Sequence, residues 1–290
     1  MDNTSLKLFL HLSKSLHFGK TGRVCNISPS ALSRQIQRME NEVGHPLFER
    51  DNRMVRLTPA GLLFKGYAQT VIEKWQDLLD ELAEDQQTLK GEISIYCSVT
   101  ASLSILPELL GNFRRCYPKV HIRLKTGDAA IAVKKVIGGD VDIAVTALPD
   151  RFPKILEFKV LTQVYPVFIA PKVSWEFSDA FKTNIPWAKT PMILSFKSLV
   201  RKRADQWFKK KKIQPNIYAQ VAGNEAILAM VALGCGVGIV PGLVVANSPI
   251  RDRIITLDVK PPLPPYDVGV CVKKRKIKFR LVRAFWEKVP

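Results

Sequence analysis

The first sixty residues show short stripes of apolar side chains at helical spacing and little of the alternation that is typical of strands. One stripe predicts a helix that ends near Leu16, and a second, less regular helix is predicted over residues 20–24. The apolar positions of the first helix are Leu6, Phe9, Leu10 and Leu12. The amino-terminal region is therefore predicted to be a small helical unit.

A third helix is predicted to start after Ser28, which can cap it, with Pro29 at the first helical position, where a missing N–H has no consequence. Its apolar stripe consists of Leu32, Ile36 and Met39. Its outward face carries Ser30, Ser33, Arg34 and Gln37. Arginine can bond the edge of guanine and glutamine that of adenine, so this face suits the DNA major groove. By composition alone, an ordinary amphipathic surface helix is the simpler interpretation.

The segment that follows favours DNA binding. Residues 51–58 are predicted to form a turn between two short strands, a wing that carries Arg53 and Arg56. Guanidinium groups at such a place can contact phosphate or enter a minor groove. Two short helices before the third helix and a basic wing after it together outweigh the ordinary interpretation.

Thr58 as cap and Pro59 at the first position are predicted to start a long helix. Apolar residues recur along it at alternating intervals of four and three, which is the seam of a coiled coil. This seam consists of Phe64, Ala68, Val71, Trp75, Leu78 and Leu82. Roughly 30 residues at about 1.5 Å each make a rod of about 45 Å. We expect a second copy of the chain to cover the seam; packing against the chain's own carboxyl-terminal region is the alternative.

From Gly91 the pattern changes to short apolar strands separated by helical segments. The predicted strands cover residues 92–97, 120–124, 142–145, 164–169, 238–240 and 268–272. Strands that alternate with helices predict an α/β fold in which helices cover the faces of a parallel sheet. About 200 residues suffice for one such domain or for two smaller lobes.

The chain has 44 lysine and arginine residues against 26 acidic residues, a net charge of +18, which indicates an anionic partner. Residues 91–290 hold 32 of the basic side chains and 15 of the acidic ones. Much of this surplus lies in runs at residues 209–212 and 273–276, without interleaved aromatic side chains on which bases could stack. We interpret these runs as solvated faces in preference to a second nucleic-acid patch.

Residue types that carry catalysis or bind metals show no functional pattern. None of the five cysteines belongs to a CxxC pair, and the four histidines have no metal-ligand spacing, so we expect no metal and no cofactor. Gly234, Gly236 and Gly238 resemble a nucleotide-binding loop only faintly, because a helix is predicted before them and a strand after them. Cys97 fits a small apolar strand end better than a nucleophile. An enzyme that converts a small acid stays the second function class, and turnover by the purified protein would support it.

Two features concern the cellular compartment. The first residues carry no basic stretch followed by an apolar core, and the cysteine pattern favours a reducing compartment. Residues 226–246 contain no charge over a length that can span a bilayer. Glycines and Pro241 interrupt them, which predicts a short helix, a turn and a short strand. We expect a cytoplasmic protein without a membrane partner.

Several runs resemble a known family. SPSALSRQI at residues 28–36, GHPLFER at 44–50 and LTPAG at 57–61 strongly resemble the winged helix-turn-helix of LysR-type transcriptional regulators. GGDVDIA at 138–144 and GCGVGIVP at 234–241 resemble the effector-binding domain of that family. The resemblance covers nearly the whole chain, and it implies a DNA-binding regulator that is not an enzyme.

The resemblance also implies a domain organisation and a set of binding partners. The parts are a winged helix-turn-helix at residues 1–58, a linker and dimerisation helix at 59–90, and an effector-binding domain at 91–290, with lobe I at about 91–162 and 267–290 and lobe II at about 163–266, like periplasmic binding proteins. The implied DNA contacts are Ser28, Pro29, Ser30, Ser33, Arg34, Gln37, Arg53 and Arg56. The implied partners are double-stranded promoter DNA, a small organic acid, RNA polymerase and further copies of the chain in a homodimer or homotetramer.

The acid is expected in a cleft between the lobes. Ligands of open α/β sheets lie beyond the carboxyl ends of strands, where helix N-termini present N–H groups to a carboxylate. Ser98 and Thr100 follow the strand that ends at Cys97 and are the first candidates for holding the acid group. They can equally serve only to cap the helix that follows.

Four further residues are expected at the cleft. Thr126 and Asp128 follow the strand that ends near residue 124. Arg201 is a candidate for a bidentate carboxylate contact, and Asn224 is a candidate ligand contact or a helix cap.

Within the family, finer similarities favour one group of regulators. Residues 91–93, 97–101, 126–130, 230–237 and 247–249 resemble activators of isoleucine and valine biosynthesis that respond to acetohydroxy acids. This implies activation of the gene for acetohydroxy acid isomeroreductase, with acetolactate or acetohydroxybutyrate as effector. A LysR-type regulator of another pathway with a different small acid is the alternative.

One departure from the family concerns the second helix, where the family usually has two alanines and this chain has Gly22 and Val24. A glycine inside a helix lowers stability by roughly 0.5 to 1 kcal/mol. We therefore expect Gly22→Ala to raise the melting temperature without weakening binding to the operator.

Overall fold

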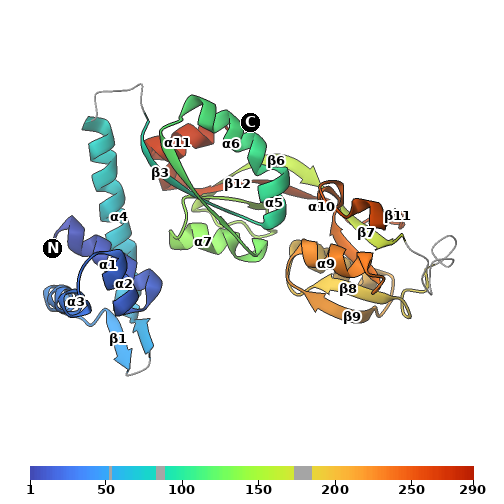
Figure 1. Cartoon of the computed structure of the whole chain (residues 1–290), viewed down its shortest axis with the longest axis horizontal. Coiled ribbons are helices and arrows are strands. Elements are labelled where there is room, and N and C mark those ends of the chain that lie inside the picture. The colour runs from blue at the N-terminus through green and yellow to red at the C-terminus, as the bar shows by residue number, and fades with distance from the viewer. Residues whose placement is uncertain (52–53, 83–88, 173–184) are drawn as a thin grey trace. The chain divides into compact units, whose positions relative to one another are not determined.

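The computed structural model describes residues 1–51, 54–82, 89–172 and 185–290. The chain folds into two compact units, Met1–Gln86 and Gln87–Pro290 (Figure 1). The long helix predicted for residues 59–90 is observed over Pro59–Leu82, and it belongs to the first unit.

The first unit is a helical domain with a two-stranded hairpin. Its elements are α1 (Asn3–Ser15), α2 (Phe18–Val24), α3 (Pro29–Val43), β1 (Phe48–Asp51), β2 (Met54–Leu57) and α4 (Pro59–Leu82). The predicted helices and the predicted hairpin are confirmed. Phe9 lies at the centre of the core, with its ring centroid 5.3 Å from that of Phe48 and 4.8 Å from that of Phe64. Aromatic packing of this kind joins α1, β1 and α4 into one unit.

Gly22 lies buried in α2, and its position changes the expectation for Gly22→Ala. A Cβ atom at this residue would lie 2.7 Å from the carbonyl oxygen of Ile27. The N–H of Ile27 in turn donates a hydrogen bond to the carbonyl oxygen of Gly22 at 3.0 Å. The backbone between α2 and α3 therefore passes too close to this helix for any side chain, and the expectation that alanine would stabilise the position does not hold.

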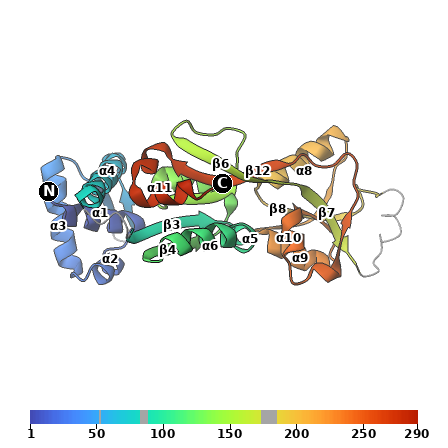
Figure 2. The ribbon, with the colours of Figure 1, turned by 90° about the horizontal axis from the view of Figure 1, so that it is seen from above.

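The second unit contains two five-stranded sheets. Lobe I, residues 89–164 and 266–290, contains β3 (Gly91–Cys97), α5 (Val99–Ser104), α6 (Leu106–Cys116), β4 (Val120–Thr126), η1 (Ala129–Ile131), α7 (Ala132–Gly138), β5 (Ile143–Ala147), β6 (Leu156–Val164), β12 (Tyr266–Lys273), η4 (Lys274–Lys278) and α11 (Arg280–Glu287). Lobe II, residues 165–172 and 185–265, contains β7 (Pro166–Pro171), β8 (Pro191–Ser195), α8 (Leu199–Lys210), β9 (Asn216–Val221), α9 (Asn224–Ala232), β10 (Val237–Pro241), α10 (Gly242–Ala246), η3 (Arg251–Arg253) and β11 (Ile254–Leu257). The chain enters lobe II after Val164 and returns at Tyr266 (Figure 2).

Both sheets are mixed, whereas the sequence predicted parallel ones. In lobe I the strand order is β4-β3-β5-β12-β6, with β12 antiparallel to both of its neighbours. In lobe II the order is β11-β7-β10-β8-β9, with β7 antiparallel to both of its neighbours. The strands that oppose their neighbours, β7 and β12, are those with which the chain enters one lobe from the other. The chain enters each of them without a crossover helix from a strand of the same sheet, and such a crossover is what a parallel connection needs.

Helices cover both faces of the lobe I sheet. The helices α6 and α11 pack on one face and α7 on the other (Figure 1). Ile93 and Ile95 point into the first layer, together with Phe113 and Phe285, whose rings lie 5.1 Å apart. This cluster of buried side chains continues into lobe II, so that the two lobes share one apolar core.

A buried ion pair attaches the carboxyl-terminal segment to the lobe I sheet. The Asp142 carboxylate lies 2.6 Å from the Lys276 ammonium and accepts a hydrogen bond of 2.8 Å from the N–H of Ser94. The side chain of Asp142 is 23% exposed and that of Lys276 is 8% exposed. Burial raises the pKa of the Asp142 carboxyl, but Lys276 and the Ser94 hydrogen bonds outweigh it and hold the pKa below its usual value. The Asp142 carboxyl is therefore ionised at neutral pH.

The uncharged segment at residues 226–246 forms most of α9, a turn and β10, as predicted, and then the short helix α10, which was not predicted. Gly234 and Gly236 in the turn have φ angles of 86° and 146°, which favour glycine. None of the described helices is both long enough and apolar enough to cross a bilayer.

Candidate functional site

The helix α3 presents one apolar face and one polar face. Leu32, Ile36 and Met39 are at most 1% exposed, which confirms the predicted stripe. The Ser28 hydroxyl accepts a hydrogen bond from the N–H of Ala31 at 3.1 Å, which confirms the predicted cap. On the outer face Ser30, Arg34 and Gln37 are exposed, and Ser33 is half-buried. An exposed guanidinium and an exposed amide on one helix face can read bases in a major groove.

Glu40 fixes this helix to the hairpin. Its carboxylate accepts hydrogen bonds from the backbone N–H groups of Leu47 and Phe48, at 2.8 and 3.0 Å. Charge-assisted hydrogen bonds of this kind are stronger than neutral ones. The orientation of β1 relative to α3 therefore depends on Glu40, which our sequence analysis did not single out.

The hairpin has the register Phe48↔Leu57 through Asp51↔Met54. Arg56 on β2 is exposed, as a phosphate contact requires. Arg53, the other predicted contact, lies outside the described residues. At the end of the hairpin the Thr58 hydroxyl accepts a hydrogen bond from the N–H of Gly61 at 2.8 Å, which confirms it as the cap of α4.

The predicted seam of α4 divides into two parts. Phe64 and Ala68 are 8% and 0% exposed, because they pack in the core of the first unit. Val71 also packs against that core. Phe64 and Ala68 are therefore unavailable to a partner helix, and Val71 is only partly accessible, which corrects the prediction. The seam assignment overlooked the domain to which the helix is joined.

The second part of the seam is accessible. Trp75, Leu78 and Leu82 are 45%, 44% and 67% exposed. Leu79, beside them, is 43% exposed. Side chains of this size on three successive helical turns form an apolar surface suited to a second helix.

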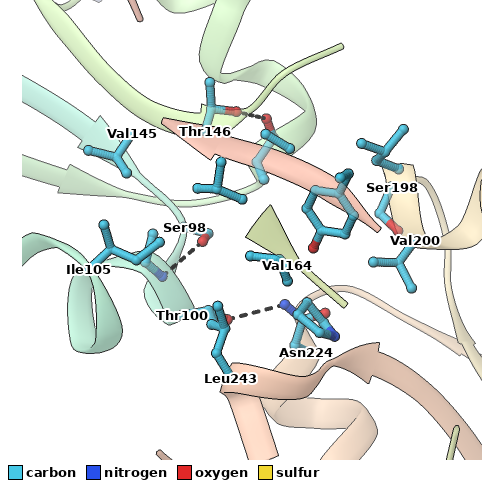
Figure 3. A pocket seen from close by; sticks show the side chains of 17 residues that line it. Ser98, Thr100, Ile105, Val145, Thr146, Val164, Ser198, Val200, Asn224 and Leu243 are labelled. Atoms are coloured by element: carbon cyan, nitrogen blue, oxygen red, sulfur yellow. Dashed lines mark hydrogen bonds between the residues drawn. The ribbon is translucent and has the colours of Figure 1, made fainter. Parts of the chain in front are cut away.

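A cleft lies where the two lobes meet, at the carboxyl ends of β3, β4, β8 and β9. Its outer compartment has a volume of about 460 Å³ and contains the charged residues Asp128, Lys197 and Glu225 in its wall. Its inner compartment, of about 100 Å³, is lined without any charged residue (Figure 3). Ser98, Thr100 and other polar residues line both compartments. The cleft can thus accept a small molecule with an apolar end and a polar end.

Ser98 caps α5, since its hydroxyl oxygen accepts a hydrogen bond from the N–H of Ala101 at 3.1 Å. A hydroxyl that accepts can still donate its own proton, so the cap does not exclude a ligand contact. Thr100 is 8% exposed, and its hydroxyl accepts a hydrogen bond from the Asn224 amide at 3.1 Å (Figure 3). It also donates one to the Glu225 carboxylate at 2.8 Å. Thr100 therefore connects lobe I to the start of α9 in lobe II.

Of the other predicted cleft residues, Asp128 and Asn224 line the cleft and Thr126 does not. Asp128 lines the outer compartment and also caps η1 by accepting a hydrogen bond of 2.9 Å from the N–H of Ala130. Thr126 is exposed at the end of β4 and lines neither compartment. Asn224 is the first residue of α9, not its cap, and lines both compartments.

Arg201 does not reach the cleft. Its Nε donates to the Asp205 carboxylate at 2.8 Å, and its Nη1 donates to the carbonyl oxygen of Ser195 at 3.0 Å. Both bonds hold the side chain, which is 17% exposed, against its own helix and the preceding strand. The predicted bidentate contact with an effector is therefore wrong for this structure, because Asp205 already occupies the guanidinium.

Two family profiles match the chain. The profile of the bacterial regulatory helix-turn-helix proteins of the lysR family matches residues 4–62, and that of the LysR substrate binding domain matches residues 86–289. The chain belongs to the LysR family. It is accordingly a DNA-binding transcriptional regulator with an effector-binding domain, and LysR regulators act as oligomers.

Its LysR relatives include regulators named IlvY. The HTH-type transcriptional activator IlvY of Salmonella typhimurium strain LT2 is 42% identical over 294 residues, which cover 100% of both chains. The HTH-type transcriptional regulator IlvY of Escherichia coli K12 is also 42% identical and covers 100% of this chain and 99% of its own. These relatives are named as regulators, in agreement with the prediction of a regulator in preference to an enzyme.

Solved LysR structures share the fold. A full-length OxyR variant from Pseudomonas aeruginosa gives a TM-score of 0.73 at 22% identity, covering 100% of this chain and 94% of that one. Full-length CbnR in complex with its target DNA gives a TM-score of 0.64 at 22% identity, covering 100% and 99%. The predicted fold class, a winged helix-turn-helix followed by a two-lobed α/β domain, is confirmed.

The effector domain of this LysR protein contains cleft residues that sequence reasoning missed. Thr146, Ser198 and Tyr266 line the inner compartment, and Lys197 and Glu225 line the outer one. Burial raises the pKa of the Tyr266 phenol, more than the Arg203 guanidinium lowers it, so the phenol stays protonated at neutral pH. The serine at 198 had a local signal as a cap, since its hydroxyl accepts a hydrogen bond from a backbone N–H of α8. Lys197 and Glu225 also had a local signal, since they adjoin Ser198 and Asn224 at the starts of α8 and α9. Thr146 and Tyr266 had none, because they lie on β5 and β12, which are distant in the sequence.

Cys97 adds no nucleophile to this cleft. It is 0% exposed, and burial raises the pKa of its thiol to about 11. Among the described residues, no cluster of three or more histidine, cysteine or acidic side chains is arranged to hold a metal ion.

Proposed function

We propose that the chain is an IlvY-type activator, which switches on a gene of branched-chain amino-acid biosynthesis, that of acetohydroxy acid isomeroreductase, in response to acetolactate or acetohydroxybutyrate. The observation that carries this proposal is the identity of 42% to IlvY activators over the full length of the chain. A regulator of another pathway with a different small acid is the second candidate, because this identity leaves room for a changed cleft.

The proposed DNA contacts come from α3 and the hairpin. Arg34 and Gln37 read base edges, while the hydroxyls near the start of α3 and Arg56 contact the DNA backbone. The residues that we assign to this surface are Ser28, Pro29, Ser30, Ser33, Arg34, Gln37, Arg53 and Arg56. The support is the exposure of Arg34 and Gln37 on α3, opposite its buried stripe, and the exposure of Arg56 on β2.

The proposed effector fits the chemistry of the cleft. An acetohydroxy acid carries a carboxylate, a hydroxyl and a ketone on a short branched carbon skeleton. Its alkyl groups suit the inner compartment, where Val145, Val164 and Val200 lie in the wall. Its carboxylate suits the outer compartment, where Lys197 and the start of α8 supply positive charge. Ser98, Thr100, Asp128 and Asn224 are the predicted contacts that stay in this proposal.

We propose that the accessible part of the α4 seam, Trp75, Leu78 and Leu82, pairs two copies, and that pairs assemble into a homotetramer. Two recognition helices then lie in successive major grooves, about 34 Å apart. Effector binding changes the closure of the lobes and so shifts an equilibrium between DNA-bound states that already exists without it. We further propose that activation involves contact with RNA polymerase and that the protein acts in the cytoplasm, where its DNA target lies.

Titration calorimetry of the full-length protein tests the proposed effector. We expect acetolactate and acetohydroxybutyrate to bind one site per chain without turnover. Pyruvate, which lacks the hydroxyl and the branch, serves as the control and is expected to bind more weakly. Binding of an unrelated acid with neither acetohydroxy acid would support the second candidate, and turnover would support an enzyme. A gel-shift assay with the promoter DNA, repeated at several salt concentrations, tests DNA binding in the same preparation.

A further inference from the structure

The only proton of the Thr100 hydroxyl is already used in a hydrogen bond. Its oxygen accepts from the Asn224 amide at 3.1 Å, and its proton goes to the Glu225 carboxylate at 2.8 Å. A hydroxyl has only one proton to donate. In this arrangement Thr100 therefore cannot donate to the carboxylate of an effector, although it lines both compartments of the cleft.

Glu225 is placed so that a ligand can reach it. It is the second residue of α9, and its carboxylate lies in the first turn of that helix, where the positive end of the helix dipole favours a negative charge. Glu225 and Thr100 line the same outer compartment, so a molecule bound there can contact both. Glu225 is also exposed at the surface of the lobe, which lets water compete for its oxygens.

We propose that Glu225 is a specificity-determining residue that accepts the hydrogen bond of the effector's hydroxyl, and that this releases the proton of Thr100 for the effector's carboxylate. The inference rests on the proposed function, since it assumes a hydroxy acid in the cleft. Before binding, Thr100 donates to Glu225. After binding, the effector hydroxyl donates to Glu225 and Thr100 donates to the effector, so every donor and acceptor stays paired.

The exchange requires little movement of the protein. Asn224 holds the Thr100 oxygen from the side, and rotation of the hydroxyl proton alone redirects the donor. Lys197 and Asp128, the other charged residues of this compartment, act on the charge of any acid, whether or not it carries a hydroxyl. Glu225 is therefore the charged residue that distinguishes an acid with the hydroxyl from an acid without it.

An acid without the hydroxyl cannot make this exchange. Either Thr100 keeps its bond to Glu225 and offers no proton, or Thr100 turns to the ligand and Glu225 loses its donor. Sites built to hydrogen-bond a hydroxyl reject analogues that lack it, by large factors when the groups are buried. Because water reaches Glu225, we expect a smaller preference, about tenfold in affinity.

The test is titration calorimetry of the full-length protein with two probes that differ in one group. Acetolactate carries a hydroxyl where 2,2-dimethyl-3-oxobutanoate carries a methyl group of similar size. We expect the wild type to bind acetolactate about tenfold more tightly. Glu225→Ala should reduce the ratio to about twofold or less, whereas Glu225→Gln keeps an acceptor oxygen and should retain most of the preference. Asp252→Ala removes a carboxylate elsewhere in lobe II and should leave the ratio unchanged.

The outcomes separate this inference from the proposed function. Equal binding of the two acids by the wild type overturns the inference but leaves an acetohydroxy acid as effector. An unchanged preference in Glu225→Ala, with an unaltered melting temperature, also overturns it. Failure of the wild type to bind either acid rejects the proposed effector itself, and the inference falls with it.

Discussion

We predict that Gly22→Ala destabilises the DNA-binding unit, although alanine is the better helix former. In a helix interior the exchange gains about 1 kcal/mol. The new Cβ atom, however, would lie 2.7 Å from the carbonyl oxygen of Ile27. This is well inside the optimum of roughly 3.5 Å for non-bonded heavy atoms, and overpacking of this kind costs about 1 to 3 kcal/mol. Taking about 2 kcal/mol for the overlap, the net loss in the free energy of unfolding is about 1 kcal/mol.

The overlap also acts on DNA binding, because the crowded atom belongs to the backbone. Ile27 directly precedes Ser28, the cap of α3, and its N–H is hydrogen-bonded to Gly22. A shift of this backbone moves the amino-terminal end of the recognition helix, where the proposed contacts begin. We therefore expect weaker binding to a specific DNA site as well as lower stability.

Gly66→Ala is the matched control. Gly66 is an exposed residue within α4, and no heavy atom beyond the adjacent backbone of the helix lies within 4 Å of the position that a Cβ would take. This exchange should gain up to about 1 kcal/mol from helix propensity alone. The two glycine-to-alanine variants should thus shift stability in opposite directions.

Scanning calorimetry of the full-length variants measures both shifts. In a unit of this size, about 1 kcal/mol corresponds to a change of about 4 to 8 °C in melting temperature. Gel shifts with a DNA site obtained by in vitro selection measure the effect on binding. If Gly22→Ala raised the melting temperature as much as Gly66→Ala does, with DNA binding intact, the argument from the close backbone approach would be refuted.

Three further predictions concern DNA binding and the buried ion pair. Arg34→Ala should lower affinity by about 1 to 3 kcal/mol and relax the base preference at one position; equal losses on the selected site and on random DNA would exclude base readout. Arg56→Ala should weaken binding to all sequences and lower the salt slope by about one, and a slope equal to that of the wild type would exclude a phosphate contact. Lys276→Met should destabilise the second unit by about 3 kcal/mol at pH 7, because it leaves the Asp142 carboxylate without a counter-charge. The pKa of Asp142 is lowered in the folded protein, so the stabilisation is present at neutral pH and is lost as the pH falls below about 4. Urea unfolding should therefore show a gap between wild type and variant that narrows in acid, and a gap that does not depend on pH would contradict this.

Local chemistry made much of the first unit predictable. The cap at Ser28, the proline after it and the stripe of Leu32, Ile36 and Met39 all lie within twelve residues, and the helix forms as they indicate. The spacing was enough to recognise the seam of α4. It did not indicate what each seam position packs against. Phe64 packs in the core of its own unit while Trp75 is exposed, and nothing in the repeat distinguishes them.

Long-range pairing limited prediction in the second unit. Residues 164–169 read as one apolar strand, whereas the chain crosses between lobes at Tyr165, so that β6 and β7 lie in different sheets. Thr100 could be predicted at the cleft, but its partner Glu225 is 125 residues away and belongs to the other lobe. The ion pair of Arg201, in contrast, could have been predicted from the sequence. Asp205 lies four residues further on the same helix, a spacing at which an ion pair is expected.

The division of α4 has a consequence for geometry. Its first half is fixed in the core through Phe64, so α3 and the exposed half of α4 rotate as one rigid body. In the proposed dimer, the number of residues between Val71 and Trp75 then sets the angle at which each copy faces the double helix. One inserted residue would turn that angle by about 100°, and with it the phase in which the two copies meet successive turns of DNA.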